Sequence, residues 1–174
     1  MNELRDALIS CGAVRFGDFT LASGAKSSYY VDIKRASTDP KVLRLIGEGF
    51  AKRVGGAQRI AGMELGAVPL AAAASLASGV PFIMVRKKPK GHGTNSQLEG
   101  VYEAGMEVVV VEDVTTSGGS SAEAVKVLRE AGLKVTKVVT VVDRESGAAQ
   151  AFADLDVRFE ALTTASELLK ARGA

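Results

Sequence analysis

The pattern of apolar and polar residues in the first third of the chain predicts a helix, two strands and a second helix. Apolar residues recur at helical spacing over the first eleven positions, and Gly12 ends this predicted helix. Residues 14–35 alternate in two halves with a short polar turn between them, which predicts two strands or a hairpin. The next helix is predicted from Pro40 to about Val54, because proline is favourable in a first helical turn.

The rest of the chain alternates between short apolar runs, which predict strands, and segments of helical periodicity. The predicted strands cover residues 59–64, 81–85, 107–113, 134–143 and 157–162. The predicted helices cover residues 68–78, 120–131, 144–155 and 165–172. Continuous apolar strands that alternate with helices indicate a parallel sheet covered on both faces. We therefore predict a single α/β domain over residues 1–174, with a central, mostly parallel sheet flanked by helices and residues 1–35 as an appendage.

The composition limits the class of protein. The 174 residues are enough for one domain with a core, and 47% hydrophobic but only 5% aromatic residues predict a core of small aliphatic side chains. A formal net charge of +2 does not indicate a general nucleic-acid binder. Cys11 is the only cysteine, which excludes a disulfide within the chain and fits a reducing compartment. Because we see no signal peptide and no apolar run of about 20 residues, we expect a cytoplasmic protein that binds neither nucleic acid nor a membrane.

The residues directly after the predicted strands are the candidate site. In open parallel sheets, ligands bind beyond the carboxyl ends of the strands. This rule selects four segments, which are 63–69, 86–100, 112–120 and 143–147. We expect the functional side chains to come from these segments.

The stretch VVVVEDVTTSGGSS, from Val108 to Ser121, is the most informative of them. It runs from a valine-rich strand into two adjacent carboxylates, Glu112 and Asp113, and then into hydroxyls and glycines before a helix. Free N–H groups at a helix start, glycines and hydroxyl donors favour a phosphate, although no Walker or dinucleotide fingerprint is present. Adjacent acids suit the two hydroxyls of a ribose, or a divalent cation. The stretch therefore indicates a ribose 5-phosphate site; the alternative is a solvated turn that Ser117 or Ser120 caps.

A cationic stretch follows the strand that ends near residue 85. Arg86, Lys87, Lys88, Lys90 and His92 lie close together in a segment that has no apolar periodicity. Such a segment can close over a polyphosphate, exclude water and open again to release product. The alternative is a solvated or nucleic-acid-binding patch.

Five segments in the same order along the chain resemble the type I phosphoribosyltransferases and, among these, the orotate phosphoribosyltransferases. The motif VVVVEDVTTSGG is similar to the phosphoribosyl-diphosphate motif of the whole group. The stretch FGDFTLASGAKSSYYVDIK resembles the N-terminal hood of the orotate enzymes, GMELGAVPLA their diphosphate loop, RKKPKGHG their mobile catalytic loop and DRESG their orotate-contacting segment. The resemblance implies the type I phosphoribosyltransferase fold, with residues 1–35 contributing a small hood.

The resemblance also implies a reaction and the residues that carry it. The reaction transfers ribose 5-phosphate from 5-phospho-α-D-ribose 1-diphosphate to orotate, and gives orotidine 5′-monophosphate and diphosphate in pyrimidine (UMP) biosynthesis. The residues implied as catalytic are Lys90, His92 and Asp113. Those implied to bind phosphoribosyl diphosphate are Arg86, Lys87, Lys90, His92, Glu112, Asp113, Val114, Thr115, Thr116, Ser117, Gly118, Gly119 and Ser120. Those implied to bind orotate are Lys26, Thr116 and Arg144.

A cofactor and a partner follow from the same resemblance. It implies Mg²⁺ held mainly by substrate oxygens rather than by a cage of protein ligands. It further implies a homodimer in which the loop of residues 86–99 is shared between the subunits. In one respect the chain departs from the family, because many relatives carry a lysine in the diphosphate loop. Here that loop has Glu64 and Leu65 and no lysine.

Alternatives stay open for single residues and for the function. Lys26 can be a hairpin-tip lysine and Arg144 a helix-start arginine, while Tyr29 and Tyr30 can either stack against a base or pack in the core. The protein can be a phosphoribosyltransferase for another nucleobase, or a non-catalytic, ligand-sensing regulator of the same fold. The cationic side chains of Lys26 and Arg144 favour orotate over the other nucleobases, because orotate is an anion that needs fixed cationic donors.

Overall fold

The computed structural model describes residues 2–20, 24, 26–88 and 96–171, and these form the α/β architecture that the sequence predicts. The helices are α1 (Asn2–Ser10), α2 (Ile33–Ser37), α3 (Pro40–Val54), α4 (Val68–Ser78), α5 (Gly119–Glu130), α6 (Ala148–Ala153) and α7 (Ala165–Ala171). The strands are β1 (Val14–Thr20), β2 (Lys26–Val31), β3 (Arg59–Met63), β4 (Phe82–Val85), β5 (Leu98–Glu99), β6 (Glu107–Thr115), β7 (Lys134–Asp143) and β8 (Arg158–Thr164). None of the described helices combines the length and hydrophobicity needed to cross a membrane.

The order of the strands in the main sheet fixes where a ligand can bind. The order is β5-β4-β3-β6-β7-β8, and the described pairs are parallel except for β4 with β5. The chain moves from β3 through α4 to β4, and later returns to the other side of β3 as β6. From β6 the chain continues through α5 to β7, and then through α6 to β8. The strand order therefore reverses between β3 and β6, and such a switch point opens a crevice at the carboxyl ends of the strands.

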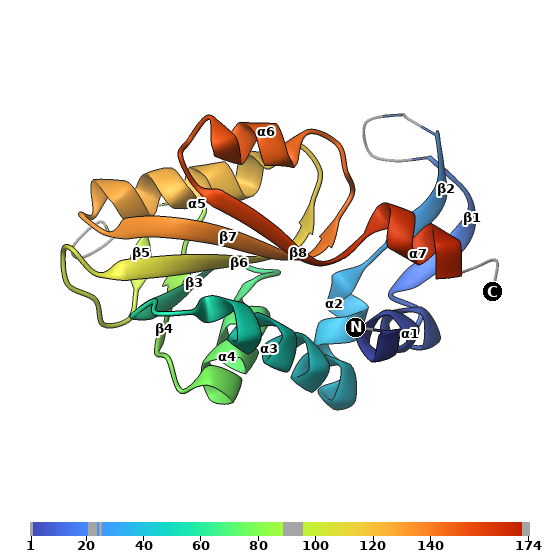
Figure 1. Ribbon diagram of the computed structural model, residues 1–174, viewed down its shortest axis with the longest axis horizontal. Coiled ribbons are helices and arrows are strands. Elements are labelled where there is room, and N and C mark those ends of the chain that lie inside the picture. Colours follow the sequence, from blue (N-terminus) through green and yellow to red (C-terminus); the bar gives the residue numbers. More distant parts are fainter. Residues whose placement is uncertain (1, 21–23, 25, 89–95, 172–174) are drawn as a thin grey trace.

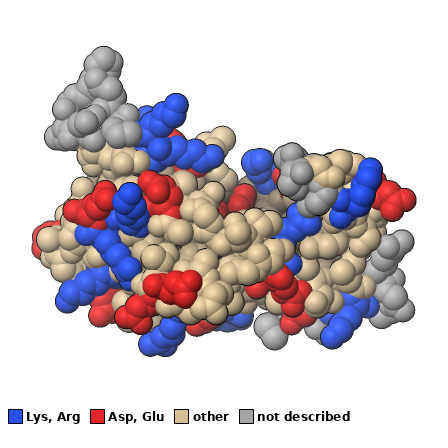
Figure 2. Space-filling view, turned by 90° about the horizontal axis from the view of Figure 1, so that it is seen from above, with Lys and Arg blue, Asp and Glu red and all other residues tan. Residues whose placement is uncertain are grey.

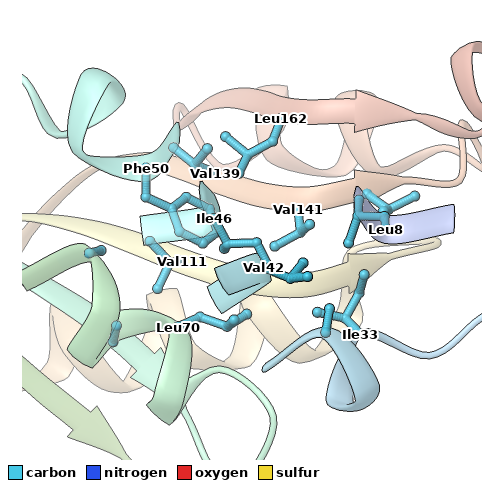
Figure 3. Close-up of a cluster of buried hydrophobic side chains, with 14 of the residues drawn as sticks. Leu8, Ile33, Val42, Ile46, Phe50, Leu70, Val111, Val139, Val141 and Leu162 are labelled. Carbon is cyan, nitrogen blue, oxygen red and sulfur yellow. The ribbon is translucent and has the colours of Figure 1, made fainter. Parts of the chain in front are cut away.

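Helices cover both faces of this sheet, with α3 and α4 on one side and α5 and α6 on the other (Figure 1). Val109 and Val111 of β6 face α3 and belong to one buried cluster with Phe50. Figure 3 shows Val111 and Phe50 in this cluster. Val108 and Val110 face α5 in a second cluster. Successive side chains of a strand point to opposite faces, and here both faces are buried. This burial explains why β6 reads as an unbroken run of valines.

The N-terminal hood is a hairpin whose base belongs to the first buried cluster. β1 and β2 pair antiparallel, with an irregular register between Phe16 and Phe19. Leu8 of α1 and Ile33 of α2 are buried in the cluster that contains α3 (Figure 3). The base of the hood is therefore packed against the sheet domain, while β1 and β2 lie at the end of the molecule away from β4 and β5 (Figure 1).

Several boundaries differ from the prediction for identifiable reasons. The sequence did not predict α2 and β5, because each is too short to show a periodic pattern. The strand β6 continues past Asp113 to Thr115, since Val114 pairs with Val142 and Thr115 pairs with Asp143 of β7. The two acids thus lie within a paired strand, which fixes their backbone.

Candidate active site

A cavity of about 230 Å³ lies at the switch point between β3 and β6. Its walls come from the ends of β3, β4 and β6, from α2 and from the first turn of α5. The residues that line it are Lys34, Met63, Glu64, Leu65, Gly66, Lys87, Glu112, Asp113, Val114 and Ser120. Three of the four segments that the sequence selected therefore meet at one place. The fourth adjoins them, because the backbone N–H of Arg144 donates to the carbonyl of Thr115 at 2.9 Å.

Glu112 and Asp113 differ in exposure and in their hydrogen bonds. Glu112 is 7% exposed, and its carboxylate accepts hydrogen bonds from the N–H of Asp113 at 3.0 Å and from the hydroxyl of Ser121 at 2.9 Å. Burial, and next the charge of Asp113, raise the pKa of Glu112 from 4.5 to about 7. Asp113 is half-buried, and its Oδ1 accepts from the N–H of Val114 at 2.6 Å. Asp113 is thus the more accessible acid, whereas Glu112 also links β6 to the first turn of α5.

The start of α5 has no side-chain cap, so its amides are available to an anion. Its N-cap is Gly118, which has a left-handed φ of 88° and lies so close to Phe152 that a Cβ would meet the ring at 3.2 Å. The turn capped by Ser117 or Ser120, which the sequence left open, is therefore not observed. The exposed residues of the loop are Thr116, Ser117, Gly119 and Ser120. The hydroxyl of Thr115 is buried and has no hydrogen-bond partner among the described residues.

The loop after β3 packs against the acidic pair. Glu64 Oε1 accepts a hydrogen bond from the backbone N–H of Lys87 at 2.7 Å, and the peptide between Glu64 and Leu65 is cis. A Cβ added to Gly66 would lie 2.6 Å from Oδ2 of Asp113. Glu64, in the loop that lacks the lysine of many relatives, thus links the loop after β3 to the loop after β4 by a hydrogen bond. Gly66 leaves room for the carboxylate of Asp113 because it has no Cβ.

Two cationic residues follow β4 directly, of which Arg86 is half-buried and Lys87 is exposed. Arg86 is half-buried, and its Nη1 lies 3.6 Å from Oε1 of Glu99 on β5. Its Nε is buried without a hydrogen-bond partner in the part of the chain that the structure describes. Lys87 is exposed and lines the cavity. Lys90 and His92 lie outside the described residues.

Of the two cations predicted to bind orotate, Arg144 adjoins the acidic motif and Lys26 points away from it. Arg144 Nε donates to the hydroxyl of Tyr29 at 3.3 Å, and Nη2 donates to Oγ of Ser27 at 3.4 Å. Lys26 lies on the opposite face of β2, because side chains alternate along a strand, and its Nζ donates to Oγ1 of Thr20 at 2.8 Å. Within one subunit the structure therefore does not bring Lys26 and Arg144 together.

The cavity includes residues that the sequence reasoning did not select. Lys34 lies on α2, which adjoins β6, and it adds a cation to the lining of the cavity. Ser121 holds Glu112 from the first turn of α5. No spacing rule could find Lys34, because it lies outside the four segments that follow the predicted strands.

The chain is similar to known proteins over nearly its whole length. Residues 39–159 match the family model of the phosphoribosyl transferase domain. An orotate phosphoribosyltransferase of Methanosarcina acetivorans is 54% identical over 170 residues, which are 97% of this chain and 91% of the relative. The chain belongs to the orotate phosphoribosyltransferase family.

Solved structures of orotate phosphoribosyltransferases share this fold. The structure from Aeropyrum pernix has a TM-score of 0.87 and 36% identity, and the match covers 98% of each chain. The structure from Mycobacterium tuberculosis in complex with 5-phospho-α-D-ribosyl 1-diphosphate has a TM-score of 0.80 and 34% identity, with 95% of this chain and 96% of that chain covered. The type I phosphoribosyltransferase fold predicted from the sequence motifs is confirmed. The roles of the single residues stay predictions.

Proposed function

We propose that this orotate phosphoribosyltransferase transfers the 5-phosphoribosyl group of 5-phospho-α-D-ribose 1-diphosphate to orotate, as a step of pyrimidine (UMP) biosynthesis. The observation that carries the proposal is the juxtaposition of Glu112 and Asp113 with the uncapped start of α5 in one cavity. Carboxylates accept hydrogen bonds from ribose hydroxyls, and free amides at a helix start bind phosphate. The complex of the Mycobacterium tuberculosis relative with the same diphosphate supports this choice of ligand.

The residues of the cavity can assist bond cleavage by position and charge. A ring nitrogen of orotate forms a bond to C1 of the ribose while the bond from C1 to the diphosphate oxygen breaks, and the nitrogen loses its proton. Positive charge develops on the ribose and negative charge on the leaving diphosphate. Asp113 lies where it can stabilise the ribose, and Lys87 lies on the wall where it can meet the diphosphate. We assign Thr116 and Arg144 to orotate.

Magnesium fits this cavity as an ion that the substrate carries. Hard cations prefer oxygen ligands, and Glu64 and Asp113 present carboxylates to the cavity. No group of three or more His, Cys, Asp or Glu residues in the described part of the chain could hold a metal ion. Most ligands would therefore come from the diphosphate and ribose oxygens. When bound, the ion neutralises part of the charge on the diphosphate.

We also propose that the protein is a homodimer and that residues 86–99 are shared across its interface. An apolar face of α3 and α4 supports a second copy as the partner. Leu76 is 90% exposed on α4, and Leu65, in the loop that leads to α4, is 78% exposed. A groove on this face is lined by Pro40, Leu43, Arg44, Glu48, Pro69, Ala72, Ala73, Leu76 and Ala77. Leu65 lines the substrate cavity, so an interface that covers both Leu76 and Leu65 would lie next to the site that the partner's loop would enter.

The decisive experiment follows orotate by its ultraviolet absorbance in the presence of phosphoribosyl diphosphate, with and without Mg²⁺. We expect turnover that depends on both Mg²⁺ and the diphosphate. Adenine, hypoxanthine and uracil are the control bases. Turnover of one of these bases but not of orotate would reassign the protein to another base.

A Lys90→Ala variant separates an enzyme from a non-catalytic regulator. We expect this variant to retain phosphoribosyl-diphosphate binding in calorimetry and to lose most of its rate. An inactive wild-type protein that still binds the diphosphate would indicate a regulator instead. On the face shown in Figure 2, Lys and Arg side chains are interspersed with Asp and Glu, which is not the single basic field typical of nucleic-acid binding. A cytoplasmic location stays a prediction.

A further inference from the structure

Arg144 is attached to the hood by one edge of its guanidinium group. Its Nε donates to the Tyr29 hydroxyl at 3.3 Å and its Nη2 donates to Ser27 Oγ at 3.4 Å. The guanidinium carbon lies 4.9 Å from the centroid of the Tyr29 ring, which adds a cation–π contact. Ser27 Oγ donates its own proton to the carbonyl of Tyr29 at 2.7 Å. The lone pairs of Ser27 Oγ can therefore accept a hydrogen bond from Arg144. The two acceptors therefore form one preorganised unit on β2.

This attachment leaves the other edge of the guanidinium free. An arginine side chain has five N–H donors, which form one pair of parallel donors at the side edge and a second pair at the end edge. The hood uses the side edge, made by Nε and Nη2. Nη1 makes no hydrogen bond within residues 2–20, 24, 26–88 and 96–171. A planar ligand with two adjacent acceptors can therefore bind at the end edge, made by Nη1 and Nη2.

The backbone of Arg144 is fixed to the phosphate motif at the same time. Its N–H donates to the carbonyl of Thr115 at 2.9 Å, and Thr115 pairs with Asp143 in the register of β6 with β7. The position of the guanidinium group is thus set from two sides. The main sheet holds its backbone beside the phosphoribosyl site, and the hood holds its side chain.

We propose that Tyr29 and Ser27 are positioning residues for orotate. They orient Arg144 so that its free edge meets two adjacent acceptors of the base, either carboxylate oxygens or a carboxylate oxygen and a ring carbonyl. The proposal rests on the assignment of orotate as the substrate. It gives the hood a defined part in base recognition, which acts through Arg144 and without direct contact between Tyr29 and the base.

The alternation of side chains on β2 supplies a matched control. Ser27 and Tyr29 are half-buried on the face toward Arg144, whereas Tyr30 lies on the exposed face. The centroid of the Tyr30 ring lies 5.7 Å from that of Phe19, and Tyr30 does not line the cavity that contains Asp113. Tyr30→Phe removes the same hydroxyl from the neighbouring residue of the same strand.

The experiment measures steady-state kinetics for both substrates with Tyr29→Phe, Ser27→Ala and Tyr30→Phe. We expect Tyr29→Phe to raise the KM for orotate about three- to tenfold, the net effect of one typical hydrogen bond, with the KM for phosphoribosyl diphosphate and the Tm unchanged. Ser27→Ala should act in the same direction, and Tyr30→Phe should resemble the wild type. In an Arg144→Gln background, Tyr29→Phe should cause no further loss of kcat/KM for orotate, because its effect is transmitted through the guanidinium.

Three results would overturn the proposal. They are an unchanged or lower KM for orotate in Tyr29→Phe, an equal rise of both KM values, and full additivity with Arg144→Gln. Each of these leaves the proposed function intact, since the wild type would still convert orotate. A wild-type protein that binds phosphoribosyl diphosphate but does not convert orotate would remove both proposals, and the two failures are thereby distinguished.

Discussion

Gly66 and Asp113 lie in contact across the switch point of the sheet. A Cβ at position 66 would stand 2.6 Å from Oδ2 of Asp113, closer than real Cβ contacts come. Gly66 belongs to the loop after β3 and Asp113 to the end of β6, so this contact joins that loop to the acidic motif. The accessible carboxylate of the site thus has its position limited by a residue 47 positions earlier in the chain (113 − 66).

Gly66→Ala is expected to displace the Asp113 carboxylate, because the carboxylate is easier to move than the backbone. We expect the Kd for phosphoribosyl diphosphate to rise by about 5- to 100-fold, the range for a lost hydrogen bond to a charged group. Titration calorimetry measures this change. Gly56→Ala is the control, since a Cβ there meets nothing within 4 Å. An alanine at position 66 that binds the diphosphate as tightly as the wild type would show that Asp113 does not need its present position.

Asp113→Asn tests the contact with the ribose hydroxyls directly. An amide retains the shape but loses the charge that accepts hydrogen bonds from the two hydroxyls. We expect a loss of about 1–3 kcal/mol in the binding free energy of phosphoribosyl diphosphate. Asp6→Asn is the control, because that side chain is 62% exposed and its one ion pair among the described residues is with its neighbour Arg5. Wild-type affinity in calorimetry would contradict the assignment of Asp113.

The raised pKa of Glu112 predicts a pH-dependent stability. The folded pKa of about 7 exceeds the ordinary value of 4.5, so the folded state binds the proton more tightly than the unfolded state. The free energy of unfolding should therefore fall as the pH rises from about 4.5 to about 7. Above about pH 7 the contribution of Glu112 to this free energy should no longer change. Glu112→Gln removes the ionisable group and should flatten this part of the profile. Urea unfolding of both proteins at pH 5, 6, 7 and 8 measures the difference; parallel profiles would refute the prediction.

Lys34→Ala tests whether α2 supplies the cation that the diphosphate loop lacks. Lys34 lines the cavity together with Glu112 and Asp113, and no other described residue of α2 does. We expect the KM for phosphoribosyl diphosphate to rise about threefold to tenfold, as for a partly screened charge, with little change in the Tm. Lys126→Ala on the exposed face of α5 is the control. Equal KM values in the two variants would exclude Lys34 from substrate binding.

Leu76→Glu tests the proposed dimer. A charge at a 90% exposed leucine costs the monomer little, but it would be buried without a partner in an interface on α4. We expect sedimentation velocity to show monomers and orotate turnover to fall strongly, because each site would lose its neighbour's loop. Val101→Glu is the control, since Val101 is 77% exposed at another place. A dimeric and active Leu76→Glu variant would place the interface elsewhere.

Mixed subunits test the shared loop separately. Lys90→Ala and Asp113→Asn subunits are each expected to be poorly active alone. If the loop crosses the interface, a heterodimer of the two contains one site with both lesions and one with neither. Mixing and refolding should then restore activity. No recovery in a verified heterodimer would indicate that each loop serves its own subunit.

The sequence determined the longer elements of the main sheet domain and the kind of chemistry. Covered parallel strands must be apolar on both faces, so β6 and β7 were visible as valine-rich runs, and Pro40 marked the start of α3. The change from valines to Glu112, Asp113 and the glycine-rich loop indicated a sugar phosphate, because few other ligands need acids beside an open helix start. These features are local, and local patterns survive in a single sequence.

Only the tertiary structure decided which residues meet. Lys34 enters the cavity because α2 packs beside β6, and Gly66 reaches Asp113 because β3 and β6 are neighbours in the sheet. The two tyrosines looked equivalent along the chain, yet the alternation of β2 places Tyr29 against Arg144 and Tyr30 on the exposed face. Such contacts depend on the register and order of strands that are far apart in sequence, and no local pattern encodes them.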